Sequence, residues 1–322
     1  MPSRIIYACF FILIAGNAFA ASPIEAAKPV AIIYFNDGSA IQKEHAQMIG
    51  GMVKEANNDF HLSIQEYPLK REEELSAEVE KIADDGVGLI IIVEPHNMDA
   101  LVKIPGLYPD IDFSIVGAKS PLYVTNARAM IFKEQEGAYM MGVLAALRTK
   151  AGAVTFMSSE DNDFTRTLAY AFQQGAKRGN ADVHVTQQLG AGAHTKTLKI
   201  DDSASDIVYV LDDALLDAAL QDAAIHKRLL ITYNHDLTNA YPALVITSLL
   251  KHYDLAIYHT LRSYSHGVWK PGSQSMGIGD GFLDYVLNSS NKALLPKETI
   301  EQLEVTKDFV SQGAVQIQAL GK

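Results

Sequence analysis

The sequence has very little cysteine. Its single cysteine, Cys9, lies in an apolar segment at the start of the 322-residue chain. Residues 1–20 follow the pattern of an export signal, with Arg4 ahead of an apolar core over 5–15 and the small-x-small site Ala18-Phe19-Ala20. We therefore expect cleavage after Ala20 and a mature periplasmic protein without a thiol or a disulfide. Because Cys9 precedes most of the apolar core, we expect no lipid anchor.

Positive charge is also scarce. Lys and Arg number 27 against 38 Asp and Glu, and the formal net charge is −11. This balance argues against nucleic acid or an anionic membrane surface as a partner. The apolar core over residues 5–15 is too short to span a bilayer comfortably. An apolar content of 48% and a length of 322 residues indicate a globular chain of two domains.

The common signatures of enzymes are missing. The sequence has no Walker A loop, no His-Glu-x-x-His and no Gly-x-Ser-x-Gly. Gly277, Gly279 and Gly281 lack the spacing of a dinucleotide site and predict a turn between two β-prone runs. We expect a protein that is not an enzyme and uses no cofactor. An exported hydrolase that uses cleft carboxylates remains the most distant alternative.

A metal site is not expected either. His252, His259 and His266 fall seven residues apart on a predicted helix over 248–266. Seven residues rise about 10.5 Å along a helix, whereas zinc ligands lie about 2 Å from the metal. The three histidines therefore predict a solvated or partly packed helix face.

Strands and helices alternate along the chain. The run over 30–35 is continuously apolar and β-branched, which is typical of a strand covered on both faces. Alternation of this kind predicts parallel, doubly wound sheets. Because the alternation restarts after residue 150, we expect an α/β fold of two Rossmann-like lobes. The expected strands cover 30–35, 61–66, 88–93, 112–116, 129–132, 153–157, 183–187, 207–211, 229–233 and 244–247.

The stretch 126–147 organises this interpretation. A short β-prone run leads into a helix that carries Glu134 and Glu136 in its first turn, where the helix dipole favours anions. Small residues then recur at spacings of three and four, which predicts that another backbone packs closely against this helix. They are Gly137, Ala138, Gly142 and Ala145, with Met141 on the same stripe.

We take this helix as the passage from one lobe to the other. The first lobe is then expected to comprise 29–125 and about 236–270. The second is expected to comprise 126–235 and about 271–322.

Polar residues follow four of the predicted strands. In open α/β sheets, ligands bind outside the carboxyl ends of the strands. Helix capping and turn formation also account for Asn, Asp and Ser at such positions. If the loops face one cleft, however, they form a site rich in hydrogen-bonding groups. The candidates are Asn36, Asp37, His96, Asn97, Ser158, Asp161, Asn234 and Asp236.

Lys251 is a further candidate for ligand binding. It falls in the first turn of the helix predicted after Ser248, where a cation opposes the helix dipole. A solvated lysine explains this position as well as a functional one. In the functional interpretation Lys251 faces the cleft, with Asp236 or Asp280 as its charge partner.

Several segments resemble the basic membrane protein family of ABC-transporter substrate-binding proteins, which includes purine nucleoside receptors. The most specific are Glu136-Gly137-Ala138-Tyr139 in its helix and the segment over 247–254 with Lys251. The resemblance implies a type I periplasmic-binding-protein fold that captures a small molecule by lobe closure and hands it to a membrane permease. We expect a monomer. The resemblance extends over 108–113, 132–146, 149–152, 172–177, 247–254 and 295–298.

The resemblance also implies roles for individual residues. Asp37 and Lys251 match ligand-binding positions of the family, and Asn234 stands where the family places an aspartate. The first loop of the family carries an aromatic residue, whereas residues 39–45 have none. Stacking is worth about 1–3 kcal/mol per base, so we expect a small polar, nucleoside-like ligand with weakened purine binding. The alternative is a ligand-sensing partner of a membrane receptor or kinase with the same fold.

Overall fold

The computed structural model describes residues 28–319 except 96, 192–199 and 201–203. The predicted signal segment and His96 lie outside the described residues. The strands are β1 (Val30–Phe35), β2 (Ile64–Leu69), β3 (Leu89–Val93), β4 (Asp112–Val116), β5 (Ala127–Phe132), β6 (Ala153–Met157), β7 (His184–Gln188), β8 (Ile207–Val210), β9 (Leu229–Tyr233), β10 (Val245–Lys251), β11 (Gly272–Met276) and β12 (Leu283–Tyr285). The helices are α1 (Ala40–Phe60), α2 (Leu75–Asp84), α3 (Met98–Leu107), α4 (Glu134–Arg148), α5 (Asp163–Gly179), α6 (Leu216–His226), α7 (Tyr253–Ser265) and α8 (Lys297–Ser311), with short 3₁₀ turns at Glu72–Glu74 and Asp213–Leu215.

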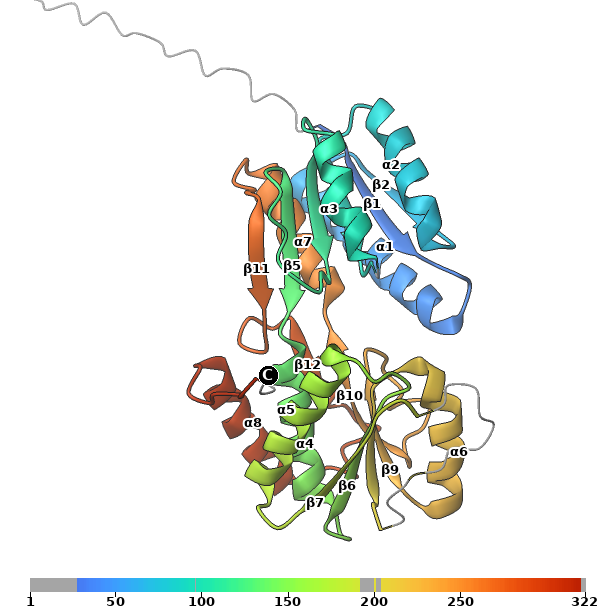
Figure 1. Cartoon of the computed structure of the whole chain (residues 1–322), viewed down its shortest axis with the longest axis vertical. Helices are drawn as coiled ribbons and strands as arrows, with labels where there is room; N and C mark the ends of the chain where they lie inside the picture. Colours follow the sequence, from blue (N-terminus) through green and yellow to red (C-terminus); the bar gives the residue numbers. More distant parts are fainter. Residues whose placement is uncertain (1–27, 96, 192–199, 201–203, 320–322) are drawn as a thin grey trace, which may run out of the picture.

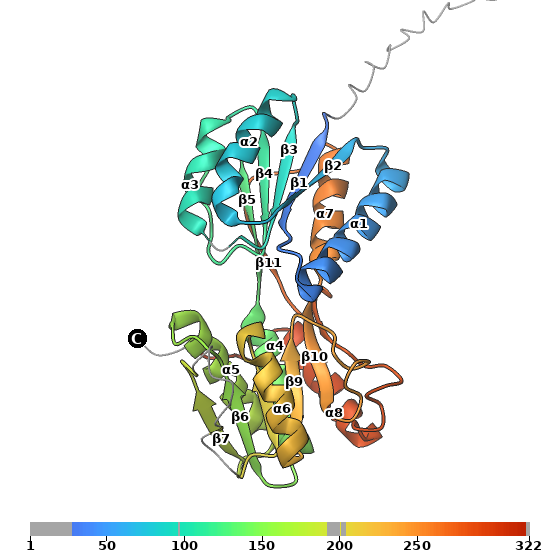
Figure 2. The ribbon, with the colours of Figure 1, turned by 90° about the vertical axis from the view of Figure 1, so that its right-hand side faces the viewer.

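The first lobe is built on a parallel sheet with the strand order β11-β5-β4-β3-β1-β2 (Figure 1). Successive side chains of a strand point to opposite faces. On β1, Val30 and Ile32 therefore pack on the side of α1 and α7. Ala31 and Ile33 pack on the side of α2 and α3. Both faces are covered, as the continuous apolar run predicts (Figure 2).

The second lobe has a sheet with the order β12-β10-β9-β8-β6-β7. Its strands are parallel except for β12, which pairs antiparallel with β10. Phe156 and Tyr209 pack with Phe172 of α5 on one face. Val208 and Val210 pack on the α6 side. The two parallel-sheet lobes confirm the predicted fold class.

The chain crosses between the lobes at Lys133, at His252 and along 277–282, and these crossovers are hydrogen-bonded to one another. The Lys133 amide donates to Met276 O at 2.8 Å, and the His252 amide donates to Phe282 O at 2.9 Å. Figure 1 shows the crossovers side by side between the lobes. The lobes are therefore joined by a bundle of strand ends rather than by one linker.

The sheet pairing changes the lobe boundaries expected from the sequence. β5 and β11 belong to the first sheet, although the sequence places both in the second lobe, and β10 belongs to the second sheet. Ala127 lies opposite Phe113 of β4, and Arg128 lies opposite Gly272 of β11. The chain therefore crosses after β5 rather than before it. Hydrophobic periodicity does not show which strands pair with one another.

The small-residue stripe of α4 packs against α5, as predicted. A Cβ atom on Gly142 would lie 2.0 Å from the carbonyl oxygen of Phe172. A Cβ atom on Gly175 would lie 1.9 Å from the carbonyl oxygen of Tyr139. The two helix backbones are thus close enough to exclude any side chain at these positions.

In the part of the chain that the structure describes, no helix combines the length and the apolar character needed to cross a membrane.

Candidate functional site

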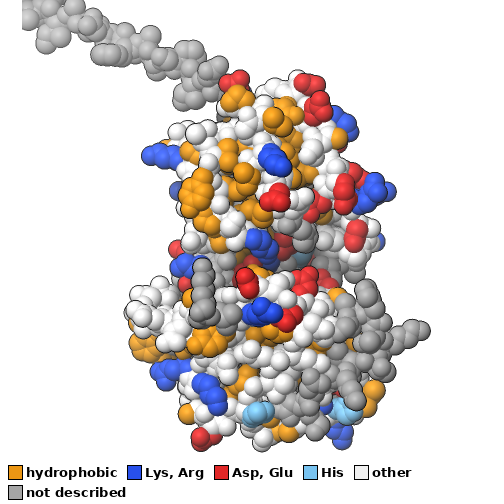
Figure 3. Space-filling model, viewed as in Figure 1, with side chains coloured by type: hydrophobic (Ala, Val, Ile, Leu, Met, Phe, Trp, Pro, Cys, Tyr) orange, Lys and Arg blue, Asp and Glu red, His pale blue; other side chains and the backbone are white. Residues whose placement is uncertain are grey.

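The carboxyl ends of strands from both lobes meet between the lobes. Glu94 directly follows β3 in the first lobe, and Lys251 ends β10 in the second. Their side chains meet across the gap, with Lys251 Nζ 2.6 Å from Glu94 Oε1. The space-filling view shows acidic and basic side chains close together where the lobes meet (Figure 3). This is the position at which open α/β sheets bind ligands.

Lys251 lies on a strand and not on a helix, so the predicted helix start at Ser248 is wrong. Val245–Lys251 form β10, and α7 begins at Tyr253. The Ser248 hydroxyl does not cap a helix but bonds Thr232 Oγ1 at 2.6 Å within the second lobe. Short apolar runs fit a strand and a buried helix equally well. The pairing of β10 with β9 and β12 shows that residues 245–251 form a strand.

Two carboxylates neutralise the Lys251 ammonium. Glu94 is the nearer, and Glu134 Oε1, in the first turn of α4, lies 3.8 Å from Nζ. The Lys251 side chain is only 2% exposed, whereas that of Glu94 is 26% exposed. The charge partners predicted from the sequence are therefore wrong: the Asp236 carboxylate accepts from Thr238, and that of Asp280 accepts from the Gly277 amide.

Aromatic rings complete the surroundings of the ammonium. Nζ lies 5.9 Å from the ring centre of Phe132, 5.1 Å from that of Tyr233 and 5.2 Å from that of Tyr253. The Tyr253 hydroxyl donates to Glu94, and the Tyr233 hydroxyl donates to Glu134. Burial and the neighbouring carboxylates raise the pKa of both phenols well above the usual value. Both tyrosines therefore stay protonated and remain donors.

The pKa values show which charges the cluster favours. Burial by itself would raise the pKa of Glu94, but the charge and hydrogen bond of Lys251 and the hydroxyl of Tyr253 hold it at about 2. Burial would lower the pKa of Lys251, but the charges of Glu134 and Glu94 outweigh it and raise this pKa. The lysine and Glu94 are both ionised at neutral pH.

This charge state predicts an acid-dependent loss of stability. The pKa of Glu94 is about 2 in the folded protein, below the ordinary 4.5. Its contribution is thus fully present above about pH 4.5 and is lost as the pH falls towards 2. In chemical unfolding at several pH values, Glu94→Gln should reduce the fall in the free energy of unfolding between about pH 4.5 and pH 2. The exposed Glu301→Gln should leave this fall unchanged. An equal fall in wild type and Glu94→Gln would contradict the pairing.

Two residues of this region have a left-handed backbone that glycine adopts more easily. Glu94 has φ 51° and Asn234, after β9, has φ 57°. The Asn234 side chain donates to the Tyr253 hydroxyl at 3.1 Å, so the two strained strand ends share one network. Strain of this kind costs of order 1 kcal/mol or more and is concentrated at functional sites. We take it as support for a binding site here.

Further contacts join the lobes on both sides of Lys251. His45 Nε2 of α1 lies 3.3 Å from the Asn234 carbonyl oxygen. On the other side, the Lys119 ammonium lies 3.4 Å from Glu134 and 4.8 Å from the ring centre of Phe164. A cavity of about 310 Å³ lies between α1 and the loop after β9, with Lys251 in its wall.

The sequence profile of a protein family matches the chain over residues 32–316. The family is described as ABC transporter substrate-binding protein, PnrA-like.

The chain belongs to this family.

Similarity to individual proteins is lower. "Basic membrane protein A" of Borreliella burgdorferi is 27% identical over 166 residues, which are 49% of this chain and 47% of that protein. The chain thus matches about half the length of this relative. A solute-binding protein of an ABC transporter system from Conexibacter woesei is 15% identical, with a TM-score of 0.70 over 91% of this chain and 99% of that one. A transcriptional activator of the comK gene from Bacillus halodurans is 16% identical, with a TM-score of 0.69 over 90% and 100%. At these identities the solved structures show the fold alone.

Of the site residues predicted for this PnrA-like protein, three come together. Lys251, Asn234 and Asp236 line the same cavity. The bond from Asn234 to Tyr253 also connects the asparagine to the Lys251 cluster.

Among the described residues, the other candidates bond to groups of their own lobe. Asn97 caps α3 by accepting from the Ala100 amide at 3.3 Å, and Asp161 pairs with Arg166 at 2.6 Å. Asn36 accepts from Gly38, Asp37 accepts from Ser39 with a lowered pKa, and Asp280 accepts from Gly277. These bonds and that of Asn97 are the capping and turn roles that the sequence also indicates, whereas Ser158 donates to Asp212, which follows the neighbouring strand β8.

The site residues predicted from the sequence do not include Glu94, Glu134 or Tyr253. Glu94 directly follows an apolar strand run, which is a usable signal for a strand-end position. Glu134 is recognisable only as a helix-start acid, and the helix predicted over β10 hides Tyr253. The Asp212 carboxylate is also missed; it accepts from the Ser158 hydroxyl at 2.9 Å and from the Ser159 amide at 2.8 Å.

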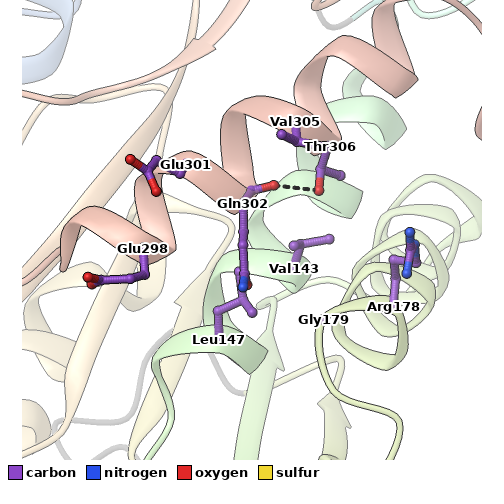
Figure 4. A pocket seen from close by; sticks show the side chains of 9 residues that line it. All are labelled: Val143, Leu147, Arg178, Gly179, Glu298, Glu301, Gln302, Val305 and Thr306. Atoms are coloured by element: carbon purple, nitrogen blue, oxygen red, sulfur yellow. Dashed lines mark hydrogen bonds between the residues drawn. The ribbon is translucent and has the colours of Figure 1, made fainter.

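A larger hollow, of about 560 Å³, lies on the second lobe away from the strand ends. Figure 4 shows α8 on one side, Arg178 near the end of α5 on the other, and Val143 and Leu147 of α4 beneath. It lacks the convergent buried charges of the interlobe cluster. We therefore place the candidate site between the lobes.

Proposed function

We propose that this protein is the exported receptor of an ABC transporter, which captures a small polar ligand between its lobes and delivers it to a membrane permease. Membership of the PnrA-like family of substrate-binding proteins supports the transport role. The observation that carries the site is the Glu94–Lys251 pair, which joins the strand ends of the two lobes. The ligand binds beside this pair, and closure of the lobes buries it.

The ligand is proposed to be a nucleoside or a similar hydroxyl-rich molecule. The family resemblance suggests this class, and the Glu94 carboxylate supplies an acceptor that matches hydroxyl groups. His45 of α1 packs edge-on against the buried Tyr253, with ring centres 5.7 Å apart, and presents its imidazole ring in the wall of the cavity of about 310 Å³.

Isothermal titration of the exported chain with nucleosides, free bases, sugars and amino acids tests this proposal. We expect one class to bind with dissociation constants in the micromolar range or below, and Tyr253→Phe to weaken that binding. Glu301→Gln, on the outer surface of the second lobe, is the matched control and should bind like wild type. Absence of binding by every class at millimolar concentration would refute the proposal.

A further inference from the structure

The position of Glu94 bears on the charge of the ligand. The resemblance implies that the lysine itself meets the ligand, but the Lys251 side chain is 2% exposed and lies against the Glu94 carboxylate at 2.6 Å. The Glu94 side chain is 26% exposed. It also lines a small cavity with Tyr34, Phe35 and Gln42 of the first lobe. A ligand entering from the first lobe therefore meets a carboxylate before it meets the ammonium.

Of the two carboxylate oxygens of Glu94, one accepts hydrogen bonds from neighbouring side chains and the other does not, as far as the described residues show. Oε1 accepts the hydrogen bonds of both Lys251 Nζ and the Tyr253 hydroxyl. Among the described residues no hydrogen bond to Oε2 is found at this site, so Oε2 remains available as an acceptor. Glu134, on the far side of the ammonium, is 6% exposed and is occupied by Lys119, Lys251 and Tyr233. The acceptor that the ligand can reach is therefore on Glu94.

The backbone at Glu94 shows that this carboxylate is held in place. Its φ of 51° lies in the left-handed region, where a glutamate is disfavoured relative to glycine. The amide of Glu94 donates to Val116 O at 2.7 Å, which fixes the turn after β3. The side chain that the strained turn presents reaches the buried lysine of the opposite lobe. The turn after β3 thus places the carboxylate that neutralises Lys251.

We propose that Glu94 determines ligand charge in this cleft: it occupies Lys251, accepts hydrogen bonds from neutral or cationic ligands, and excludes phosphorylated and carboxylate-bearing ones. Two like charges a few Å apart near a protein surface repel each other. An anionic group beside Glu94 meets this repulsion and finds the lysine already paired. This inference rests on the proposed function for the identity of the cleft, and it assigns the ligand class of that cleft.

The test uses inorganic phosphate as an anionic probe at constant ionic strength. Wild type should show no binding by titration calorimetry and no phosphate-specific thermal shift. Glu94→Gln removes the charge and keeps the shape of the side chain, whereas Glu94→Gly removes the side chain and suits the left-handed turn. Either variant should bind phosphate with an affinity at least about tenfold above the upper limit that the titration sets for wild type. Adding Lys251→Met should remove that gain, and Glu301→Gln should behave as wild type.

A second measurement needs no variant. Wild type is titrated with a nucleoside and with its 5′-monophosphate, and we expect the monophosphate to bind at least about tenfold more weakly. Equal binding of the two would overturn the inference, as would folded Glu94 variants without any Lys251-dependent phosphate binding. If no neutral ligand binds wild type while the variants gain phosphate binding through Lys251, the proposed function fails and the role of Glu94 stands.

Discussion

Replacing Gly142 by alanine should lower the free energy of unfolding by about 3 kcal/mol, because the added methyl has no space. Its Cβ would lie 2.0 Å from the Phe172 carbonyl oxygen and 2.8 Å from the Ala176 amide nitrogen. Both atoms belong to the backbone of α5, so neither can move without separating the two helices. Chemical unfolding followed by circular dichroism measures the loss.

The matched control is the same substitution at Gly51. This glycine lies on the exposed face of α1, and a Cβ there would meet nothing within 4 Å. Helix propensity then acts alone, and Gly51→Ala should stabilise the protein by up to about 1 kcal/mol. The two substitutions thus have opposite expected signs. A neutral or stabilising Gly142→Ala would contradict the close approach of α4 and α5.

Replacing Lys251 by methionine should cost about 3–5 kcal/mol at neutral pH, because it leaves Glu94 and Glu134 without their shared cation. The lysine side chain is buried, so water cannot replace it easily. Chemical unfolding at pH 7 measures the loss. The exposed Lys81, which pairs with Glu78 at 2.9 Å, is the control, and Lys81→Met should change stability little.

A double variant separates charge from packing. Glu94→Gln combined with Lys251→Met removes one charge of each sign and leaves Glu134 with Lys119 as a partner. This double variant should be more stable than Lys251→Met alone. If the two are equally unstable, the loss comes from packing of the lysine stem among Phe132, Tyr233 and Tyr253, and the ionic account of the cluster is wrong.

The fold was largely predictable because the central strands are mostly apolar runs. β4, β6 and β9 begin and end at the predicted residues. Parallel strands covered on both faces leave this signal in the sequence. The close packing of α4 was predictable for a related reason, since glycines are costly inside a helix and their helical spacing indicates a close backbone neighbour. The alternation predicted the two Rossmann-like lobes, and the family resemblance implied the type I binding-protein fold.

The site was less predictable because its decisive contacts join residues far apart in the chain. Glu94 and Lys251 are 157 positions apart, and no local pattern pairs them. The strand ends were correctly singled out as polar, but Asn97 and Asp161 there serve helix caps and a surface ion pair. The mistaken helix at Ser248 had a local cause, because a short apolar run suits either structure.

The central claim, that the lobes close on a ligand, is tested most directly by a distance between the lobes. Spin labels on Ser120→Cys in the first lobe and Asp163→Cys in the second serve this purpose, since both positions are exposed and the only natural cysteine is Cys9. Electron spin resonance would report the distance with and without the ligand found by titration. We predict a shorter and narrower distance distribution with ligand, and a smaller change for Lys251→Met. An unchanged distribution at saturating ligand would contradict capture by lobe closure.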